Sequence, residues 1–299
     1  MNYRMRLPIF TLFAIAFFVA TPSLFAQSQQ SQQGQQQQQS QSQQQTNPPA
    51  QNQKPSLQNP QQNPPVPPPV DAKEEAAYKS FYDMKPSTAA ENDAAIQAGE
   101  TFLKDYPQSR YRESVYTRLT MLYFQKRDMD KMYENADKAL ALDPNNVDVL
   151  VQVGWVIPRG NPSTPDYQQM LTKAEQYEKH ALEILSTLTK PVGLTDDQFN
   201  RAKADKSSQA HSGLGLVYFR ENKFDESSAE LAKATDGVPD PDPTDYYVLG
   251  IDLSNLQKYP ESAKAFDSCA QIASSIQDQC KQQSAAAKAK EGAAPPHKP

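Results

Sequence analysis

The segment from His211 to Cys269 repeats one pattern of apolar and small residues after 35 positions. The two copies are Leu214, Gly215, Tyr218, Phe224, Leu231 and Ala234, and then Leu249, Gly250, Leu253, Tyr259, Phe266 and Cys269. A period of about 34 residues is typical of a unit made of a helix, a turn and a second helix. Such a unit cannot bury its apolar face alone, so the pattern predicts hairpins that stack on one another.

These positions resemble the tetratricopeptide repeat family. The resemblance implies an all-α fold, a tetratricopeptide-type α-solenoid of about five helical hairpins plus a capping helix. Gly215 and Gly250 would then let the second helix of each hairpin pack closely against the first. Tyr218, Phe224 and Leu231 would be apolar knobs that fill the next hairpin.

Two hairpins are expected at the start of the repeat domain. The first runs from about residue 71 to Tyr106, where the following proline ends the helix because the residue before proline is pushed out of the helical region. The second has Thr120 where Gly or Ala is usual, and it closes at residues 143–146, Asp-Pro-Asn-Asn. At the other end, residues 276–288 are polar enough to form a capping helix.

The third hairpin departs from the pattern. Its small residue, Gly154, lies one repeat length after Thr120, but residues 158–165 hold three prolines where a tight turn would be expected. The next small residue, Gly215, follows Gly154 by much more than one repeat. We assign the extra length to a loop and to longer helices, not to a separate domain. Thr195 followed by Gln198 predicts a capping box at the start of the helix that carries Gly215.

Residues 1–70 differ in composition from the rest. Residues 1–26 resemble a secretory signal peptide, with two arginines, an apolar run and a plausible cleavage site before Gln27, so we expect an exported protein that is periplasmic, bound to the cell envelope or secreted. An uncleaved anchor is the alternative; the run is short for a membrane span, so none is expected in the mature chain. Residues 27–70 hold 19 Gln and 9 Pro and are expected to be a disordered linker, most simply a spacer, with a proline-rich ligand or filler as alternatives. The repeat domain is expected over 71–290 and a disordered tail over 291–299.

Nothing in the sequence predicts catalysis, a cofactor or a metal site. The three histidines have no metal-ligand spacing, and the Gly213-Leu214-Gly215 stretch lacks the third glycine of a dinucleotide fingerprint. Asp240, Asp242 and Asp245 resemble part of a calcium loop, but prolines interrupt it. Without residues 1–26, 28 basic and 35 acidic residues give a net charge of −7, which argues against nucleic acid as a partner.

Protein recognition is the function that the family resemblance implies. First helices of successive hairpins line a groove in such proteins, and a partner peptide or helix binds there. Trp155, the only tryptophan, is the strongest candidate anchor. The corresponding positions form a mostly apolar set: Thr117, Met121, Phe124, Val151, Trp155, Ser212, Leu216, Phe219, Tyr247, Ile251 and Asn255. The alternative is that the chain covers this groove itself, with the proline-rich insertion or with the N-terminal segment.

We therefore expect a non-catalytic protein–protein interaction scaffold of the cell envelope or periplasm. Two alternatives remain. One is a structural envelope protein that self-associates as a homo-oligomer, and the other is an accessory subunit of an envelope enzyme or secretion machine.

The two cysteines, Cys269 and Cys280, suggest a disulfide because an exported chain meets an oxidising compartment. On one unbroken helix the two positions would lie about 16 Å apart, which exceeds the roughly 7 Å limit between bridged Cα atoms. A helix break near Ser274 would let the capping helix fold back, so we predict a disulfide that staples it. Cys269 as a small buried apolar residue is the alternative.

Overall fold

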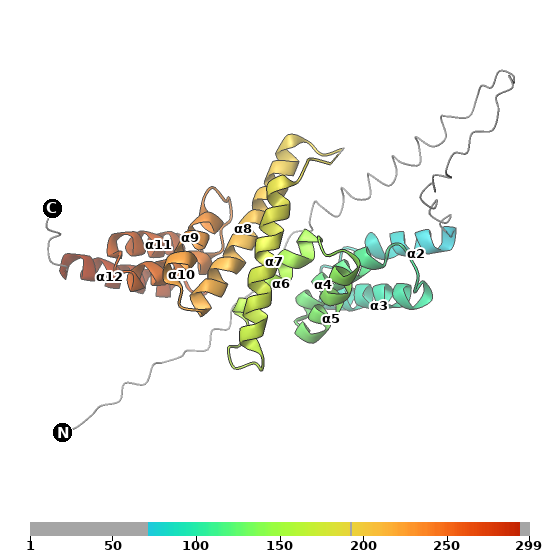
Figure 1. The fold of residues 1–299 in the computed structure, drawn as a ribbon, viewed down its shortest axis with the longest axis horizontal. Helices are drawn as coiled ribbons and strands as arrows, with labels where there is room; N and C mark the ends of the chain where they lie inside the picture. Colours follow the sequence, from blue (N-terminus) through green and yellow to red (C-terminus); the bar gives the residue numbers. More distant parts are fainter. Residues whose placement is uncertain (1–70, 192, 294–299) are drawn as a thin grey trace, which may run out of the picture. The chain divides into compact units, whose positions relative to one another are not determined.

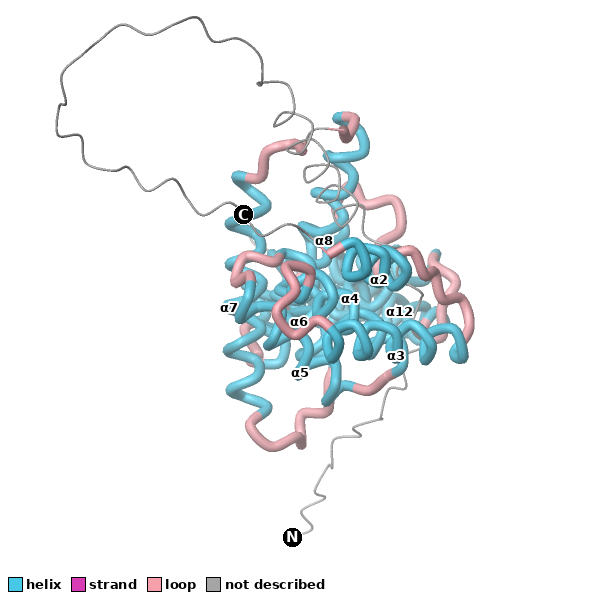
Figure 2. Tube along the Cα trace, turned by 90° about the vertical axis from the view of Figure 1, so that its right-hand side faces the viewer, coloured by secondary structure: helices cyan, strands magenta, loops and turns pink. Residues whose placement is uncertain are grey.

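The structure is a computed structural model that describes residues 71–191 and 193–293. The expected signal peptide, the Gln- and Pro-rich segment and the end of the tail lie outside these residues. Within the described ranges every regular element is a helix, as the tube in Figure 2 shows, and this confirms the all-α prediction.

The helices follow one another as hairpins, which Figure 1 shows in chain order. Each hairpin consists of a helix, a connecting segment and a second helix. Over the described residues, five hairpins and a final helix confirm the predicted α-solenoid. The pairs are α2 (Ala72–Tyr82) with α3 (Ala89–Asp105), α4 (Arg112–Lys126) with α5 (Met129–Leu142), α6 (Val147–Val156) and the short 3₁₀ helix η1 (Ile157–Arg159) with α7 (Tyr167–Thr187), α8 (Asp196–Arg220) with α9 (Phe224–Thr235), and α10 (Pro243–Asn255) with α11 (Tyr259–Gln271), followed by α12 (Gln277–Ala293).

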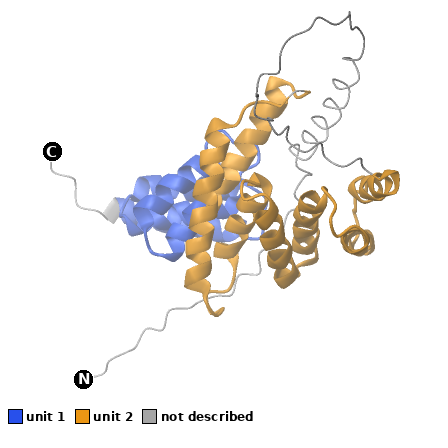
Figure 3. Cartoon of the chain, turned by 45° about the vertical axis from the view of Figure 1, so that its right-hand side comes forward, with its two compact units in different colours: residues 1–22, 214–299 blue, residues 23–213 orange. Residues whose placement is uncertain are grey.

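The chain forms two compact units that divide within α8, between Gly213 and Leu214 (Figure 3). We call the described residues up to Gly213 the N-terminal unit and those from Leu214 the C-terminal unit. Each is described by itself below.

Three hairpin turns share one backbone geometry. Arg127, Asn222 and Gln257 have φ of 63°, 60° and 60°, the left-handed region that helices often use to end. Each occupies the same place relative to the small position of its own hairpin. In each turn the next amide N–H reaches back to the first helix, and the bonds are Asp128 to Tyr123 (3.0 Å), Lys223 to Tyr218 (2.9 Å) and Lys258 to Leu253 (2.8 Å).

The glycines of the C-terminal unit allow close helix packing, as predicted. A Cβ on Gly215 would lie 2.7 Å from Leu231 Cγ, and one on Gly250 would lie 2.7 Å from Phe266 Cε1. A second repeated contact was not predicted. Ser227 donates to the Gly215 carbonyl (2.9 Å), and Ser262 donates to the Gly250 carbonyl (2.7 Å). The two serines are separated by the same interval as the two glycines, so the sequence repeat contained this signal.

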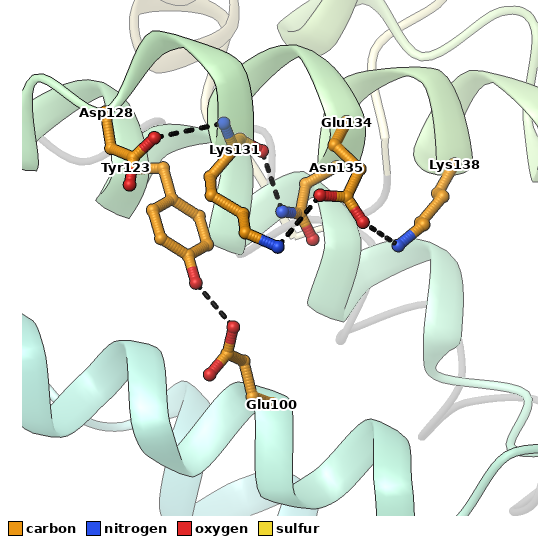
Figure 4. Close-up of polar contacts among 7 residues, drawn as sticks. All are labelled: Glu100, Tyr123, Asp128, Lys131, Glu134, Asn135 and Lys138. Carbon is orange, nitrogen blue, oxygen red and sulfur yellow. Dashed lines mark hydrogen bonds and ion pairs between the residues drawn. The ribbon is translucent and has the colours of Figure 1, made fainter.

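One side-chain hydrogen bond joins α3 and α4, and further polar contacts lie along α5 (Figure 4). The Tyr123 hydroxyl on α4 donates to Glu100 on α3. On α5, Glu134 bonds Lys138 at 2.7 Å and Lys131 at 2.9 Å, and these two lysines, Lys138 first, lower the pKa of Glu134 to about 2. Such exposed pairs stabilise a helix face only modestly.

The third hairpin carries the extra length as the sequence indicated. The additional chain lies in the loop after η1 and in α7 and α8, which have 21 and 25 residues. The capping box at the start of α8 is confirmed, because Gln198 N–H donates to Thr195 Oγ1 (3.2 Å) and Thr195 N–H donates to Gln198 Oε1 (3.0 Å).

In the C-terminal unit the chain leaves the helix after Gln271 and resumes it at Gln277, and α12 packs against α11. Cys269 and Cys280 are fully buried and joined by a disulfide, with their Cα atoms 5.8 Å apart. The break brings together two residues that one straight helix would hold far apart.

Candidate functional site

The predicted groove positions have different surroundings. Val151, Ser212 and Leu216 have only 0%, 2% and 5% of their surface exposed, so a partner could not reach them. The prediction was wrong for these three positions. Val151 packs in a cluster with Leu150, Ala181 and Ala210, because α7 and α8 are long enough to cover this side of α6.

In the C-terminal unit the capping helix occupies two of the predicted positions. Tyr247 and Ile251 pack against a cluster in which Ala263 and Phe266 of α11 meet Ala287 of α12. Gln279 of α12 also donates a hydrogen bond to the Tyr247 hydroxyl. Phe219 is partly buried beside another cluster, and Asn255 is exposed.

Four predicted residues of the N-terminal unit lie on two first helices that contact each other, α4 and α6. We call them the α4–α6 surface: Thr117, Met121, Phe124 and Trp155, all partly exposed. Phe124 meets Trp155 edge-on, with ring centroids 6.3 Å apart and an interplanar angle of 82°. This T-shaped arrangement is favourable for aromatic pairs.

A hydrogen-bonded cluster lies at the Thr117 end of the α4–α6 surface. Glu113 accepts a bond from the Thr117 hydroxyl (2.8 Å) and another from the Asn146 amide, which also lies 2.8 Å from the Thr117 hydroxyl. Asn146 is the N-cap of α6, and its oxygen accepts from Val149 N–H (3.0 Å). One end of the surface is therefore polar and acidic, whereas the other is aromatic.

Arg159 covers one face of Trp155. Its guanidinium carbon lies 3.6 Å from the ring centroid, and its nitrogens donate to the Trp155 carbonyl and to Ser212 Oγ, both at 2.9 Å. Arg159 ends η1, at the start of the proline-rich insertion. The sequence had allowed the insertion to cover the groove, and this residue does so at Trp155.

A buried carboxyl group, that of Glu178 on α7, lies beside Gly154 and Gly213. A Cβ placed on Gly213 would be 2.0 Å from Glu178 Oε1 and 3.1 Å from Trp155 Cα, and one on Gly154 would be 2.6 Å from the same oxygen. Glu178 therefore occupies the position that Leu231 and Phe266 occupy against Gly215 and Gly250. The third hairpin has an acid where its neighbours have an apolar knob.

Burial raises the pKa of Glu178 well above the usual range of a carboxyl group, while Arg159 and then Lys206 act in the opposite direction. Neither carboxyl oxygen has a hydrogen-bond partner among the described residues. Lys206 pairs with Asp148 at 2.7 Å, and both side chains are less than a fifth exposed. A buried charge without a hydrogen-bond partner is costly, so the neutral acid is the favoured form.

Sequence reasoning missed Glu178 because the insertion changes its spacing. Leu231 and Phe266 follow their glycines at one and the same interval, but Glu178 follows Gly154 at a longer one. Among the described residues no group of three or more His, Cys, Asp or Glu could hold a metal ion, and none of their helices is long and apolar enough to cross a membrane.

The sequence matches no protein-family model and is similar to no curated protein. Among solved structures the chain is similar to TTC0263, a thermophilic tetratricopeptide protein of Thermus thermophilus, at 17% identity and TM-score 0.45, with 72% of this chain and 99% of that chain covered. It is also similar to PilW, a type IV pilus biogenesis factor, at 14% identity and TM-score 0.48, with 77% and 96% covered. These are likenesses of fold alone.

The chain's own geometry repeats from hairpin to hairpin. Its C-terminal hairpins repeat one residue pattern, and equivalent glycines contact equivalent knobs. Equivalent turns also have a left-handed residue at the same position and an equivalent backbone hydrogen bond. In its repeat length and its helical hairpins, the chain has the architecture that is typical of tetratricopeptide repeats.

Proposed function

We propose that this protein is a non-catalytic scaffold that binds a protein partner at the α4–α6 surface. The observation that carries the proposal is the edge-on pair of Phe124 and Trp155, which two successive first helices leave partly exposed. Tryptophan is enriched among residues that dominate binding energy, because a large rigid side chain buries much area at a small entropic cost.

The partner segment that suits this surface has an apolar or aromatic side chain that reaches Trp155. At the other end it presents a hydrogen-bond donor to the Glu113, Thr117 and Asn146 cluster. An amphipathic helix or an extended peptide can supply both groups.

The test is chemical crosslinking in the native host, followed by capture of the protein. Trp155→Ala should weaken partner binding by about 2 kcal/mol or more, and the partner band should be lost. Tyr116→Ala is the matched control, since Tyr116 also lies on α4 and pairs with a cation, Lys138, whose nitrogen is 5.6 Å from the ring centroid. Equal capture by both variants would refute the site.

The proposed location is the cell envelope or periplasm, and the sequence of residues 1–26 supports it. N-terminal sequencing of the protein recovered from its host should begin at Gln27. A start at Met1 would favour a retained anchor.

Self-association is the second candidate role. Light scattering of the purified protein separates it from the first, because a concentration-dependent rise in mass supports self-assembly and a constant monomer mass supports a different partner.

A further inference from the structure

We propose that the groove between α2 and α3 is a binding site for an extended proline-rich segment, and that residues 64–70 of this same chain, Pro-Pro-Val-Pro-Pro-Pro-Val, occupy it. The inference goes beyond the proposed function, because it concerns a different surface and needs no partner protein. It also narrows the expectation for residues 27–70, of which only the last seven would be held against the repeat domain.

The groove lies between the two helices of the first described hairpin and has a volume of about 420 Å³. That volume is within the roughly 300–1,000 Å³ of typical ligand pockets. Ala77 on α2 and Ala94 and Ala98 on α3 line it with small side chains. The rings of Phe81 and Phe102, both buried, also belong to the lining. The groove therefore suits a narrow apolar segment.

The groove residues of α3 lie on a different stripe from the one that faces the next hairpin. Asn92 marks the side toward α4, because its amide donates to the Leu122 carbonyl at 3.1 Å. Ala94 and Ala98 are one helical turn apart on another stripe, and Ala94 is exposed. A solenoid hairpin contacts a neighbour on each side. Since α2 is the first described helix, the chain just before it is the nearest in sequence to the side away from α4.

The proline-rich segment is attached at one end of the groove. α2 and α3 run antiparallel: the Tyr78 and Phe102 ring centroids lie 6.0 Å apart, and one turn further along α2 a Cβ on Gly99 would lie 2.9 Å from Phe81 Cε2. The start of α2 therefore lies at the Tyr106 end of the groove. Attachment beside a site gives the segment an effective concentration on the order of millimolar, so even weak docking is favoured.

The lengths of the groove and the segment agree. The stripe of α3 from Ala94 to Tyr106 is about 18 Å long at the rise of an α-helix. Residues 64–70 measure about 22 Å as a polyproline II helix, which is the conformation that such a sequence favours. One or two residues can therefore reverse the chain beside α2 while the others fill the groove.

Proline also meets the hydrogen-bonding requirement of a covered segment. A buried backbone N–H without a partner is costly, and proline has no N–H. Five of residues 64–70 are proline, so only Val66 and Val70 have one. The carbonyl groups still need donors, and Ser80, Gln97 and Thr101 bring hydroxyl and amide donors to the groove. Grooves with aromatic rings are known docking sites for polyproline II segments.

Photocrosslinking within the full-length protein tests the inference. A photoreactive phenylalanine analogue at Val66 should form crosslinks inside one chain to Gln97, Ala98 or Thr101, which mass spectrometry of the digested protein identifies. The same probe at Leu57, which precedes the segment, should not form them.

Two variants of α3 provide a matched pair. Ala98→Arg places a long charged side chain in the groove and should abolish the crosslinks from Val66. Ala90→Arg makes the same change at an exposed position of α3 outside the groove and should keep them. Circular dichroism checks that both variants fold.

A change in the segment itself leaves α2 and α3 as they are. The double variant Pro67→Gly with Pro68→Gly should lower the crosslink yield from Val66, because glycine adds two N–H groups and loses the preference for an extended chain.

Four results would overturn the inference: crosslinks from Val66 only to residues outside the groove, crosslinks that persist in Ala98→Arg, their loss in Ala90→Arg, or an unchanged yield in the double proline variant. Adducts of twice the chain mass would also overturn it, because the segment would then occupy the groove of a second copy. These measurements do not involve Trp155, so they succeed or fail independently of the proposed function.

Discussion

Asp252 of α10 makes the stability of the C-terminal unit depend on pH. Its side chain is fully buried, and its Oδ2 lies 2.5 Å from the Ser227 hydroxyl, which also donates to the Gly215 carbonyl at 2.9 Å. A hydroxyl has one hydrogen to donate. Both contacts are satisfied together only when Asp252 is protonated and donates to Ser227.

The magnitude follows from the raised pKa. Burial raises the pKa of Asp252 from 3.8 to about 7, although a hydrogen bond donated by Ser227 to the ionised carboxyl group would act to lower it. The folded protein then binds a proton more tightly than the unfolded chain, so this contribution is fully present below the unfolded pKa of 3.8 and is lost as the pH rises to about 7. A shift of about three pKa units corresponds to about 4 kcal/mol of unfolding free energy.

Asp252→Asn tests this directly, because asparagine keeps the shape and can donate to Ser227 but does not ionise. Urea unfolding at pH 4 and pH 8 should give similar free energies for the variant and wild type at the lower pH. At pH 8 the variant should be more stable by up to about 4 kcal/mol.

Asp267→Asn is the control with the opposite sign. Bonds from Lys288 first and then Ser284 lower the pKa of Asp267, so its loss should reduce stability slightly at neutral pH. Parallel pH profiles for Asp252→Asn and wild type would refute the reasoning.

Three further predictions concern the repeat. Gln257→Gly should stabilise the protein by about 0.5–1 kcal/mol in thermal unfolding, because glycine adopts φ of 60° without strain. Gly250→Ala should destabilise it by about 1–3 kcal/mol in the same assay, since the new Cβ would collide with Phe266. Intact-mass analysis after alkylation should show that Cys269 and Cys280 are blocked without reductant and react after reduction; two alkylated thiols in the unreduced sample would exclude the disulfide.

The sequence predicted the repeat because its signals are local. A glycine and its knob belong to the two helices of one hairpin, and the turn residue lies between them in the chain. Thr195 and Gln198, three residues apart, likewise predicted the cap of α8. Packing and turn geometry at such separations depend on few residues, so the pattern shows them directly.

The site was harder to predict because the exposure of its residues depends on how the two extended helices, α7 and α8, pack against α6. Val151 and Ser212 have the expected register on first helices, yet α7 and α8 are extended and leave them buried. The insertion also displaces Glu178 from its expected spacing and brings Arg159 onto Trp155. Neither effect has a local sequence signal.

The central claim is that the α4–α6 surface contacts a partner, and site-specific photocrosslinking tests it most directly. A photoreactive residue at Met121 should give one discrete adduct in the native host, and Trp155→Ala should abolish it. The same probe at Glu134, which is exposed on α5, should give no such adduct. An adduct that survives Trp155→Ala, or identical adducts from both positions, would contradict the account.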